Sequence, residues 1–386
     1  MKKFVIDALV NFVGWAPELI LLLTDLAILV GSGNEHQVAG ASVAGVLLGA
    51  IGRLVRAPSS VTTKMAERYS RHRRQLLTLN YIWSAAGVGL LLLVWSAAAT
   101  LEDFVGLEGC ASYLAWAVPG NILVRAHVPG YEACSTNLRK PWGRALLPWL
   151  TATINVPLTW WLVNTQGMGA EGAALGTFVS LIPESLLFVY WAHKEKLLDT
   201  SVNTTLMRLV LRRSKEPLKG AGASFASSVA ALFLNRWLGR EMATRWTYIH
   251  TCCDVVGGMA ICIYWGAAKH YTLNLKDAVL RCRIWRAGET SATVVLSVSL
   301  IVGYMYTEWL AVPVCLAFVL AKRQAFLRSR DATQEGFDAT GRGKMAYAAC
   351  CVVGYGGLVI AVEPSLGAAT VVYCVAQTAQ YMAMRK

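Results

Sequence analysis

The sequence predicts an all-α integral membrane protein with about 12 transmembrane helices, arranged as two parallel six-helix repeats. Of its 386 residues, 55% are hydrophobic and only 15% are charged, whereas a soluble domain carries about 25% charged residues. Apolar stretches of about 20 residues, enough to cross a ~30 Å hydrocarbon core, recur along the chain. The placement of Lys and Arg between these stretches is the third observation behind the prediction.

The apolar stretches follow one another from the first residues to the last. In chain order they lie near residues 4–30, 38–56, 76–98, 111–127, 145–163, 172–192, 221–238, 246–267, 290–306, 309–325, 345–361 and 366–384. The first stretch follows Met-Lys-Lys, as the core of a signal peptide does, but it is longer than such a core and lacks a small-residue cleavage site. We therefore interpret it as the first retained helix.

The basic residues predict how these helices are oriented in the membrane. If Lys2 and Lys3 are cytoplasmic and the connections alternate, all but three of the 36 Lys and Arg fall on the cytoplasmic side. Such an excess is the usual mark of cytoplasmic loops, and it accounts for the net charge of +13 without nucleic acid. We predict cytoplasmic termini and a bacterial cytoplasmic membrane. Arg125, at a cytoplasmic helix end, is expected to extend its guanidinium to the interface.

A basic segment near the midpoint divides the predicted helices into two halves. We predict an N-terminal six-helix bundle over residues 1–194, a basic cytoplasmic linker over 195–219 and a C-terminal six-helix bundle over 220–386. Gly172-Ala173-Ala174, at the start of the sixth stretch, is repeated by Gly367-Ala368-Ala369 at the start of the twelfth. Parallel repeats place a substrate site between the halves, near the midplane. The alternative is that the halves share only generic helix-packing residues.

Two neighbouring motifs resemble a known transporter family. Asn155-Val156-Pro157-Leu158, followed by Gly167-Met168-Gly169 and Gly172-Ala173-Ala174-Leu175-Gly176-Thr177, resembles the fifth and sixth helices of multidrug and toxic compound extrusion (MATE) transporters. That family belongs to a superfamily that also contains lipid-linked oligosaccharide flippases. The resemblance implies twelve helices in two parallel halves, as the charge pattern does, and export of solutes driven by an ion gradient.

The sequence also has a weaker local resemblance to another class of exporter, and it departs from the MATE pattern at one position. Val124-Arg125-Ala126-His127, with Gly130, resembles the progressive ankylosis-type exporters, which are linked to export of organic and phosphate anions. Proton-coupled MATE members often carry an Asp in the fifth helix, and the matching position here is Thr159. The resemblance therefore leaves the coupling ion and the sign of the substrate's charge open.

Asp25 is the acid that the sequence places most clearly inside an apolar stretch. Leu21-Leu22-Leu23 precedes it and Leu26-Ala27-Ile28-Leu29 follows it. An ionisable group in a membrane span costs about 2.5–3.5 kcal/mol on insertion scales, so such groups usually have a role or a partner. We predict that Asp25 couples H⁺ or Na⁺ movement to export. The alternative is an acid that faces a water-filled cleft or pairs with a neighbouring helix.

Other polar and aromatic residues in or near the stretches are candidates for substrate binding. They are Glu184, Asp254, Asn155, Thr159, Trp160, Arg236 and Arg240. Glu184 follows Pro183, which can kink the helix at a midplane site. Arg236 and Arg240 lie on the predicted outer side, where they could receive an anionic solute or else pair with Glu241 and lipid phosphates. Trp160 could line an aromatic cavity or belong to the interfacial belt.

The motifs that the sequence lacks narrow its function. It contains no Walker A sequence, no G-x-S-x-G and no H-E-x-x-H, and its ten Cys show no C-x-x-C or Cys/His ligand spacing. We therefore expect no enzyme activity, no bound metal and no cofactor apart from the coupling ion. We predict a secondary active exporter of a small organic solute that works by alternating access as a monomer in the bilayer. The alternatives are a lipid-linked saccharide flippase, an organic-anion exporter, a membrane-embedded transferase and a non-transporting assembly subunit.

Overall fold

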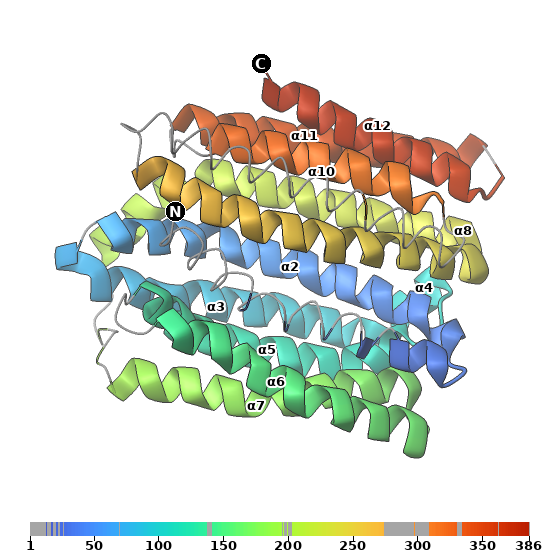
Figure 1. The fold of residues 1–386 in the computed structure, drawn as a ribbon, viewed down its shortest axis with the longest axis horizontal. Coiled ribbons are helices and arrows are strands. Elements are labelled where there is room, and N and C mark those ends of the chain that lie inside the picture. The colour runs from blue at the N-terminus through green and yellow to red at the C-terminus, as the bar shows by residue number, and fades with distance from the viewer. Residues whose placement is uncertain are drawn as a thin grey trace. The chain divides into compact units, whose positions relative to one another are not determined.

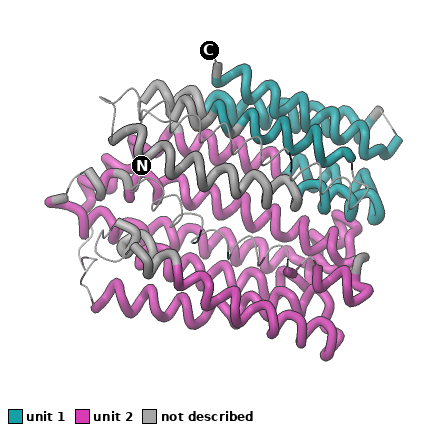
Figure 2. Tube along the Cα trace, in the orientation of Figure 1, with its two compact units in different colours: residues 1–19, 229–386 teal, residues 20–228 magenta. Residues whose placement is uncertain are grey.

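The fold is helical throughout the part of the chain that the structure describes. The computed structural model describes Val13, Pro17, Leu21, Thr24, Asp25 and residues 27–68, 70–136, 141–194, 196, 199, 203–273, 297, 309–329, 334–361 and 363–385. These residues form helices and connections, without a strand among them (Figure 1). The predicted all-α class is confirmed. Contacts group the chain into two compact units, residues 20–228 and residues 1–19 with 229–386 (Figure 2).

The unit of residues 20–228 contains most of the described helices. Its first described helical residues are Leu21, Thr24, Asp25 and 27–31. The elements that follow are α2 (Glu35–Arg68), η1 (Ser70–His72), α3 (Arg73–Ser96), α4 (Ala98–Val105), α5 (Cys110–Thr136), α6 (Pro141–Trp160), η2 (Trp161–Thr165), α7 (Gly169–Lys194) and the start of α8 (Thr204–Leu273). Figure 1 shows α3, α5, α6 and α7 in neighbouring rows, and α5 packs against α2, α3 and α7.

The second unit contains the rest of α8 together with α10 (Ala311–Ser329), α11 (Gln334–Ala361) and α12 (Leu366–Arg385). These last three helices all pack against one another. Gly239, with φ of 71° and ψ of 176°, interrupts α8 between the predicted seventh and eighth stretches. An L side chain rarely adopts that backbone conformation, so a glycine permits the break here.

Five of the described helical segments are long and apolar enough to cross a membrane. They are Gln37–Thr63, Arg73–Ser96, Leu146–Thr165, Gly169–Lys194 and Gly341–Ile360. These segments coincide with the predicted second, third, fifth, sixth and eleventh stretches. The protein is therefore an integral multi-pass membrane protein. The full count of twelve crossings and the orientation of the termini remain predictions.

Several helices continue beyond the predicted apolar stretches. The second stretch was expected to end near residue 56, yet α2 extends to Arg68, and α8 begins at Thr204, inside the predicted linker. The extra turns are held by a small apolar core that includes Met65, Leu76 and Val210, from α2, α3 and α8. Residues 204–219 of the linker are therefore helical. The boundaries predicted for the two bundles are untested by these contacts.

The start of α2 lies very close to the connection between α4 and α5. A Cβ atom built on Gly40 would stand 2.8 Å from the backbone nitrogen of Cys110 and 2.9 Å from the carbonyl carbon of Glu108. Real Cβ atoms do not approach backbone atoms this closely. Gly45, on the same helix, has no described atom within 4 Å of the corresponding position. Gly40 therefore permits a contact between backbones, and Gly45 does not take part in one.

Candidate functional site

Asp25 is linked by hydrogen bonds to two other helices of its unit. The Thr177 hydroxyl of α7 donates to Asp25 Oδ2 at 3.2 Å. The side-chain amide of Asn155, on α6, donates to the same Thr177 oxygen at 2.9 Å. Tyr113 of α5 lies near enough to Asp25 to interact with its charge. We call Asp25, Thr177 and Asn155 the Asp25 network.

The Asp25 network is buried on its α6 side, and it and the neighbouring Thr159 contain polar atoms without a partner among the described residues. Asn155 and Thr159 are both 0% exposed. Among the described residues, Asp25 Oδ1, Asn155 Oδ1 and Thr159 Oγ1 have no hydrogen-bond partner. Buried polar atoms are nearly always satisfied by protein, water or a bound ion. These three atoms are therefore the natural donors and acceptors for an ion or water beside Asp25.

Gly176 explains how α6 and α7 come together at this point. A Cβ atom on Gly176 would stand 3.1 Å from Thr159 Cα and would overlap the Thr159 hydroxyl oxygen. The missing side chain lets Thr159 rest directly against α7. The structure thus brings together three of the residues singled out from the sequence, Asp25, Asn155 and Thr159. It adds Thr177, which the sequence contained only as the last residue of a resemblance motif.

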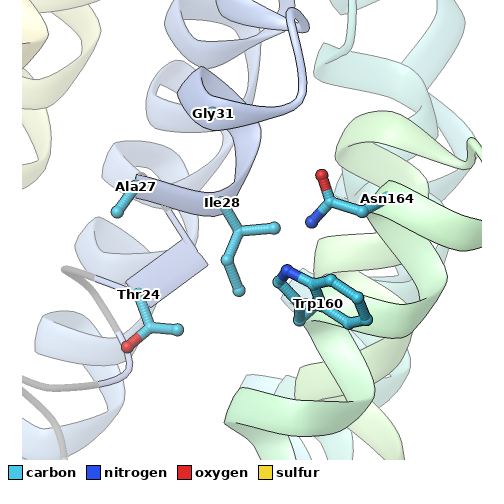
Figure 3. Close-up of a pocket in the computed structure, with 6 residues that line it drawn as sticks. All are labelled: Thr24, Ala27, Ile28, Gly31, Trp160 and Asn164. Atoms are coloured by element: carbon cyan, nitrogen blue, oxygen red, sulfur yellow. The ribbon is translucent and has the colours of Figure 1, made fainter.

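A pocket lies next to Asp25 in the same unit. It has a volume of about 410 Å³ and is lined by Thr24, Ala27, Ile28, Gly31, Trp160 and Asn164. Figure 3 shows Trp160 and Asn164 on one wall facing Ile28 on the other. Trp160 is 56% exposed. A mainly apolar wall with a few polar groups, at this volume, is typical of a site for a small molecule.

The polar end of this pocket comes from an irregular turn. Trp161–Thr165 adopts a π-helix directly after α6. Such turns are rare and are frequently found at functional sites. Here the turn contains Asn164, which Figure 3 shows directed toward the pocket. Trp160, one of the predicted candidates, lines this pocket, and its predicted role in binding is untested.

Glu184 lies in a second polar cluster, farther along α7. It is 7% exposed, and its carboxylate accepts a hydrogen bond from the Thr151 hydroxyl of α6. The adjacent Ser185 hydroxyl lies 2.8 Å from His127 Nδ1 on α5. Two consecutive residues of α7 therefore reach two different helices. The sequence indicated Glu184 alone and contained no signal for its partners.

The remaining predicted residues belong to the other unit. Arg236 and Arg240 lie on α8, on either side of the break at Gly239, and both take part in further interactions. Asp254 is also on α8, but its side chain lies outside the described residues. The predicted roles of these three residues are untested. Among the described residues, no group of three or more His, Cys, Asp or Glu could hold a metal ion.

Arg125 differs from its sequence-based prediction. It was expected to reach the membrane interface, but it is 4% exposed. Its side chain runs past two glycines, with Nη2 3.3 Å from a Cβ position at Gly52 and Cδ 3.4 Å from one at Gly87. The prediction is wrong because these glycines on α2 and α3 leave room for a long side chain between the helices.

Comparisons with known proteins find the same fold. No protein-family model matches the sequence, and no curated protein matches it. A solved inward-facing multidrug resistance MATE family transporter of the MOP superfamily has a TM-score of 0.67 and 16% identity, covering 98% of this chain and 97% of its own. An outward-facing structure of a multidrug resistance MATE family transporter has a TM-score of 0.65 and 15% identity, covering 99% of this chain and 93% of its own.

A third solved structure broadens the comparison. It is a MOP superfamily transporter from Pyrococcus furiosus whose binding pocket has reverse polarity, which was taken to suggest a different function. It has a TM-score of 0.62 and 15% identity, covering 100% of this chain and 95% of its own. The helices, their order and nearly the whole length of the chain are shared with these proteins. The chain therefore has the fold of these MATE transporters.

Proposed function

We propose that the protein is a secondary active transporter that exports a small organic solute in exchange for H⁺ or Na⁺, with Asp25 as the coupling residue. The hydrogen bonds from Thr177 and Asn155, beside the pocket, are the observation that carries this proposal. A carboxylate only accepts hydrogen bonds, whereas a protonated carboxyl also donates one. Binding of a proton or a sodium ion at Asp25 therefore changes how the first helix is held to α6 and α7.

Coupling requires that this change reach the solute. Thr24, Ala27 and Ile28 line the pocket from the helix that also carries Asp25, and Trp160 faces them from α6. A shift of the first helix relative to α6 would change the shape of the pocket directly. Solved structures with this fold include an inward-facing and an outward-facing transporter, which supports alternating access as the working cycle.

The lining of the pocket favours cationic or neutral aromatic solutes. An exposed indole binds organic cations through its π face, and the neighbouring Asp25 supplies negative charge when it is ionised. Asn164 offers both a donor and an acceptor to orient a polar group. Release of the ion from Asp25 would strengthen attraction for a cation, and binding of the ion would weaken it. An exchange mechanism requires this opposition, in which binding of the ion lowers the affinity for the solute and release of the ion raises it.

An organic-anion exporter is the second candidate, because of Arg125. Its Nη1 atom is buried and has no hydrogen-bond partner among the described residues. Arg56, an exposed residue of α2, lies near enough to repel its charge. Two neighbouring guanidinium groups attract carboxylates and phosphates. An anionic substrate is therefore tested beside the cationic ones.

The proposed function is tested by flux into proteoliposomes under a proton or a sodium gradient, with cationic dyes compared against citrate and pyrophosphate. We expect one class to accumulate in the wild type. Asp25→Asn should abolish gradient-driven accumulation, because an amide cannot release a proton or neutralise Na⁺, while exchange of labelled for unlabelled solute continues. Asp103→Asn, the same change at an exposed position of α4, is the matched control. Accumulation by Asp25→Asn at the wild-type level would exclude Asp25 as the coupling residue.

A further inference from the structure

The polar contacts between α6 and α7 continue well past Asp25. Three pairs define the register of the two helices: Thr159 with Gly176, Asn155 with Thr177, and Thr151 with Glu184. Residue numbers fall along α6 as they rise along α7, so the helices are antiparallel. The α6 residues lie at successive turns and therefore share one face. We call the facing polar residues the α6–α7 seam: Thr151, Asn155 and Thr159 with Thr177, Ser180 and Glu184.

The seam is shielded from the surface of the unit. Five of its six residues are buried, and Thr177 is half-buried. Hydroxyl and amide side chains commonly join membrane helices by hydrogen bonds, but a buried carboxyl group such as that of Glu184 is rare in a membrane-spanning helix pair. Polar residues at such depth commonly mark the path of an ion or a proton. The seam therefore calls for a role beyond holding α6 against α7.

The seam connects two carboxyl groups. Asp25 meets it at Thr177, and Glu184 lies in it about 10 Å farther along α7, at 1.5 Å per residue. Between them lie the hydroxyls of Ser180 and Thr151 and the unpartnered Asn155 Oδ1. A hydroxyl can accept a proton as it donates its own, and an amide oxygen can hold a bridging water. Spacings of this length are within reach of a short chain of such groups.

The groups around Glu184 suit a residue that exchanges protons. The Thr151 hydroxyl of α6 donates a hydrogen bond to the Glu184 carboxylate. The hydroxyl of the adjacent Ser185 lies 2.8 Å from His127 Nδ1 of α5. Arg125 and Arg56 act electrostatically on His127. The sequence predicts that the C-terminal end of α7, with His193 and Lys194 in its last turn, is cytoplasmic. Glu184 lies nearer to that end than Asp25 does.

We propose that Glu184 is a second proton-binding residue, which passes protons along the α6–α7 seam between the cytoplasmic side and Asp25. The step moves one proton from the Asp25 carboxyl to the Glu184 carboxylate, which releases it toward the cytoplasm, and it leaves Asp25 as the carboxylate, ready to be protonated again. No bond other than those to the proton changes, and nothing is oxidised or reduced. This inference rests on the proposed function, with H⁺ as the coupling ion.

Glu184→Gln separates proton transfer from packing. The glutamine keeps the size of the side chain and an oxygen that can accept the Thr151 hydrogen bond, but it cannot carry a proton. A residue on the path of proton release affects the rate of coupling, whereas the final gradient depends only on the number of protons exchanged per solute. Exchange of solute for solute requires no net proton movement. Loss of a relay residue should therefore lower the initial rate alone, whereas loss of a structural residue should lower solute exchange as well.

The test measures proton-driven accumulation of ethidium, or of citrate if the wild type transports anions, in proteoliposomes of the full chain. For Glu184→Gln we expect an initial rate lowered by about tenfold, an unchanged final accumulation and unchanged solute exchange. Glu184→Asp should recover part of the rate. Glu171→Gln, on the same helix but bonded to Trp116 and outside the seam, should behave as the wild type.

The outcomes distinguish this inference from the function on which it rests. An unchanged initial rate in Glu184→Gln would overturn the relay, and so would a loss of solute exchange in parallel with the rate, which indicates a structural role. A lowered final accumulation would also overturn it, because Glu184 would then be a stoichiometric coupling site. A wild type that shows no proton-driven accumulation, whichever solute is offered, would instead refute proton coupling itself.

Discussion

At the scale of single residues, Thr177 has an unusual double role. Its hydroxyl donates to Asp25 and at the same time accepts from Asn155, so the first helix and α6 are joined through one atom of α7. A hydrogen bond to a charged group contributes about 1.5–3 kcal/mol. Loss of this hydroxyl would leave both partners inside the unit without their donor or acceptor.

Replacement of Thr177 by valine should therefore weaken coupling without a change of shape. We expect gradient-driven transport by Thr177→Val to fall by about tenfold or more, since the ionised form of Asp25 loses its donor. Thr177→Ser keeps the hydroxyl and should transport as the wild type does. Initial rates in proteoliposomes, normalised to the amount of reconstituted protein, provide the measurement. Equal rates for the valine and serine variants would show that the hydroxyl has no part in coupling.

Some of these residues could be predicted from the sequence and others could not. Asp25 was visible because a charge interrupts a long apolar stretch, and Asn155 and Thr159 were visible through a resemblance. Thr151 is an ordinary residue for a membrane helix, so its importance appears only once α7 places Glu184 against it. Arg125 was misjudged because the two glycines that accommodate it lie on other helices, far away in the sequence.

At the scale of helices, the close contact at Gly40 sets the position of α2. A methyl group on Gly40 would meet backbone atoms of Glu108 and Cys110, and backbone cannot rotate away as a side chain can. Overpacking of this kind costs about 1–3 kcal/mol. We expect Gly40→Ala to lower the unfolding temperature in detergent by a few degrees, and Gly45→Ala, on the same helix, to leave it unchanged. Equal unfolding temperatures for the two variants would show that the contact at Gly40 does not hold α2 in place.

Helix positions were easier to predict from the sequence than helix lengths. An apolar stretch marks the part of a helix that crosses the hydrocarbon, and glycines with positive φ, such as Gly33 at 79°, end helices where the polar connections were expected. Hydropathy carries no information on turns that continue into water. The ends of α2 and α8 therefore became apparent only from the core around Met65 and Val210.

At the scale of the whole molecule, the predicted orientation can be tested directly. Epitope tags inserted in the connections at Gly33 and Gly106 should be accessible from outside intact cells, and a tag at the exposed turn residue Lys196 only after permeabilisation. The reason is the excess of Lys and Arg in alternate connections. Retained transport activity in each tagged protein is the control for correct insertion. Any other pattern of accessibility would contradict the alternating topology and the cytoplasmic placement of α7's C-terminal end.

Every member of the Asp25 network and of the α6–α7 seam lies within residues 20–228. Under the proposed function, the residues that bind the driving ion therefore belong to one contiguous stretch of the sequence. The proposed solute pocket lies in the same stretch. A hybrid that joins residues 20–228 to the second half of a distant transporter would therefore be expected to inherit both the ion preference and the solute preference of this protein.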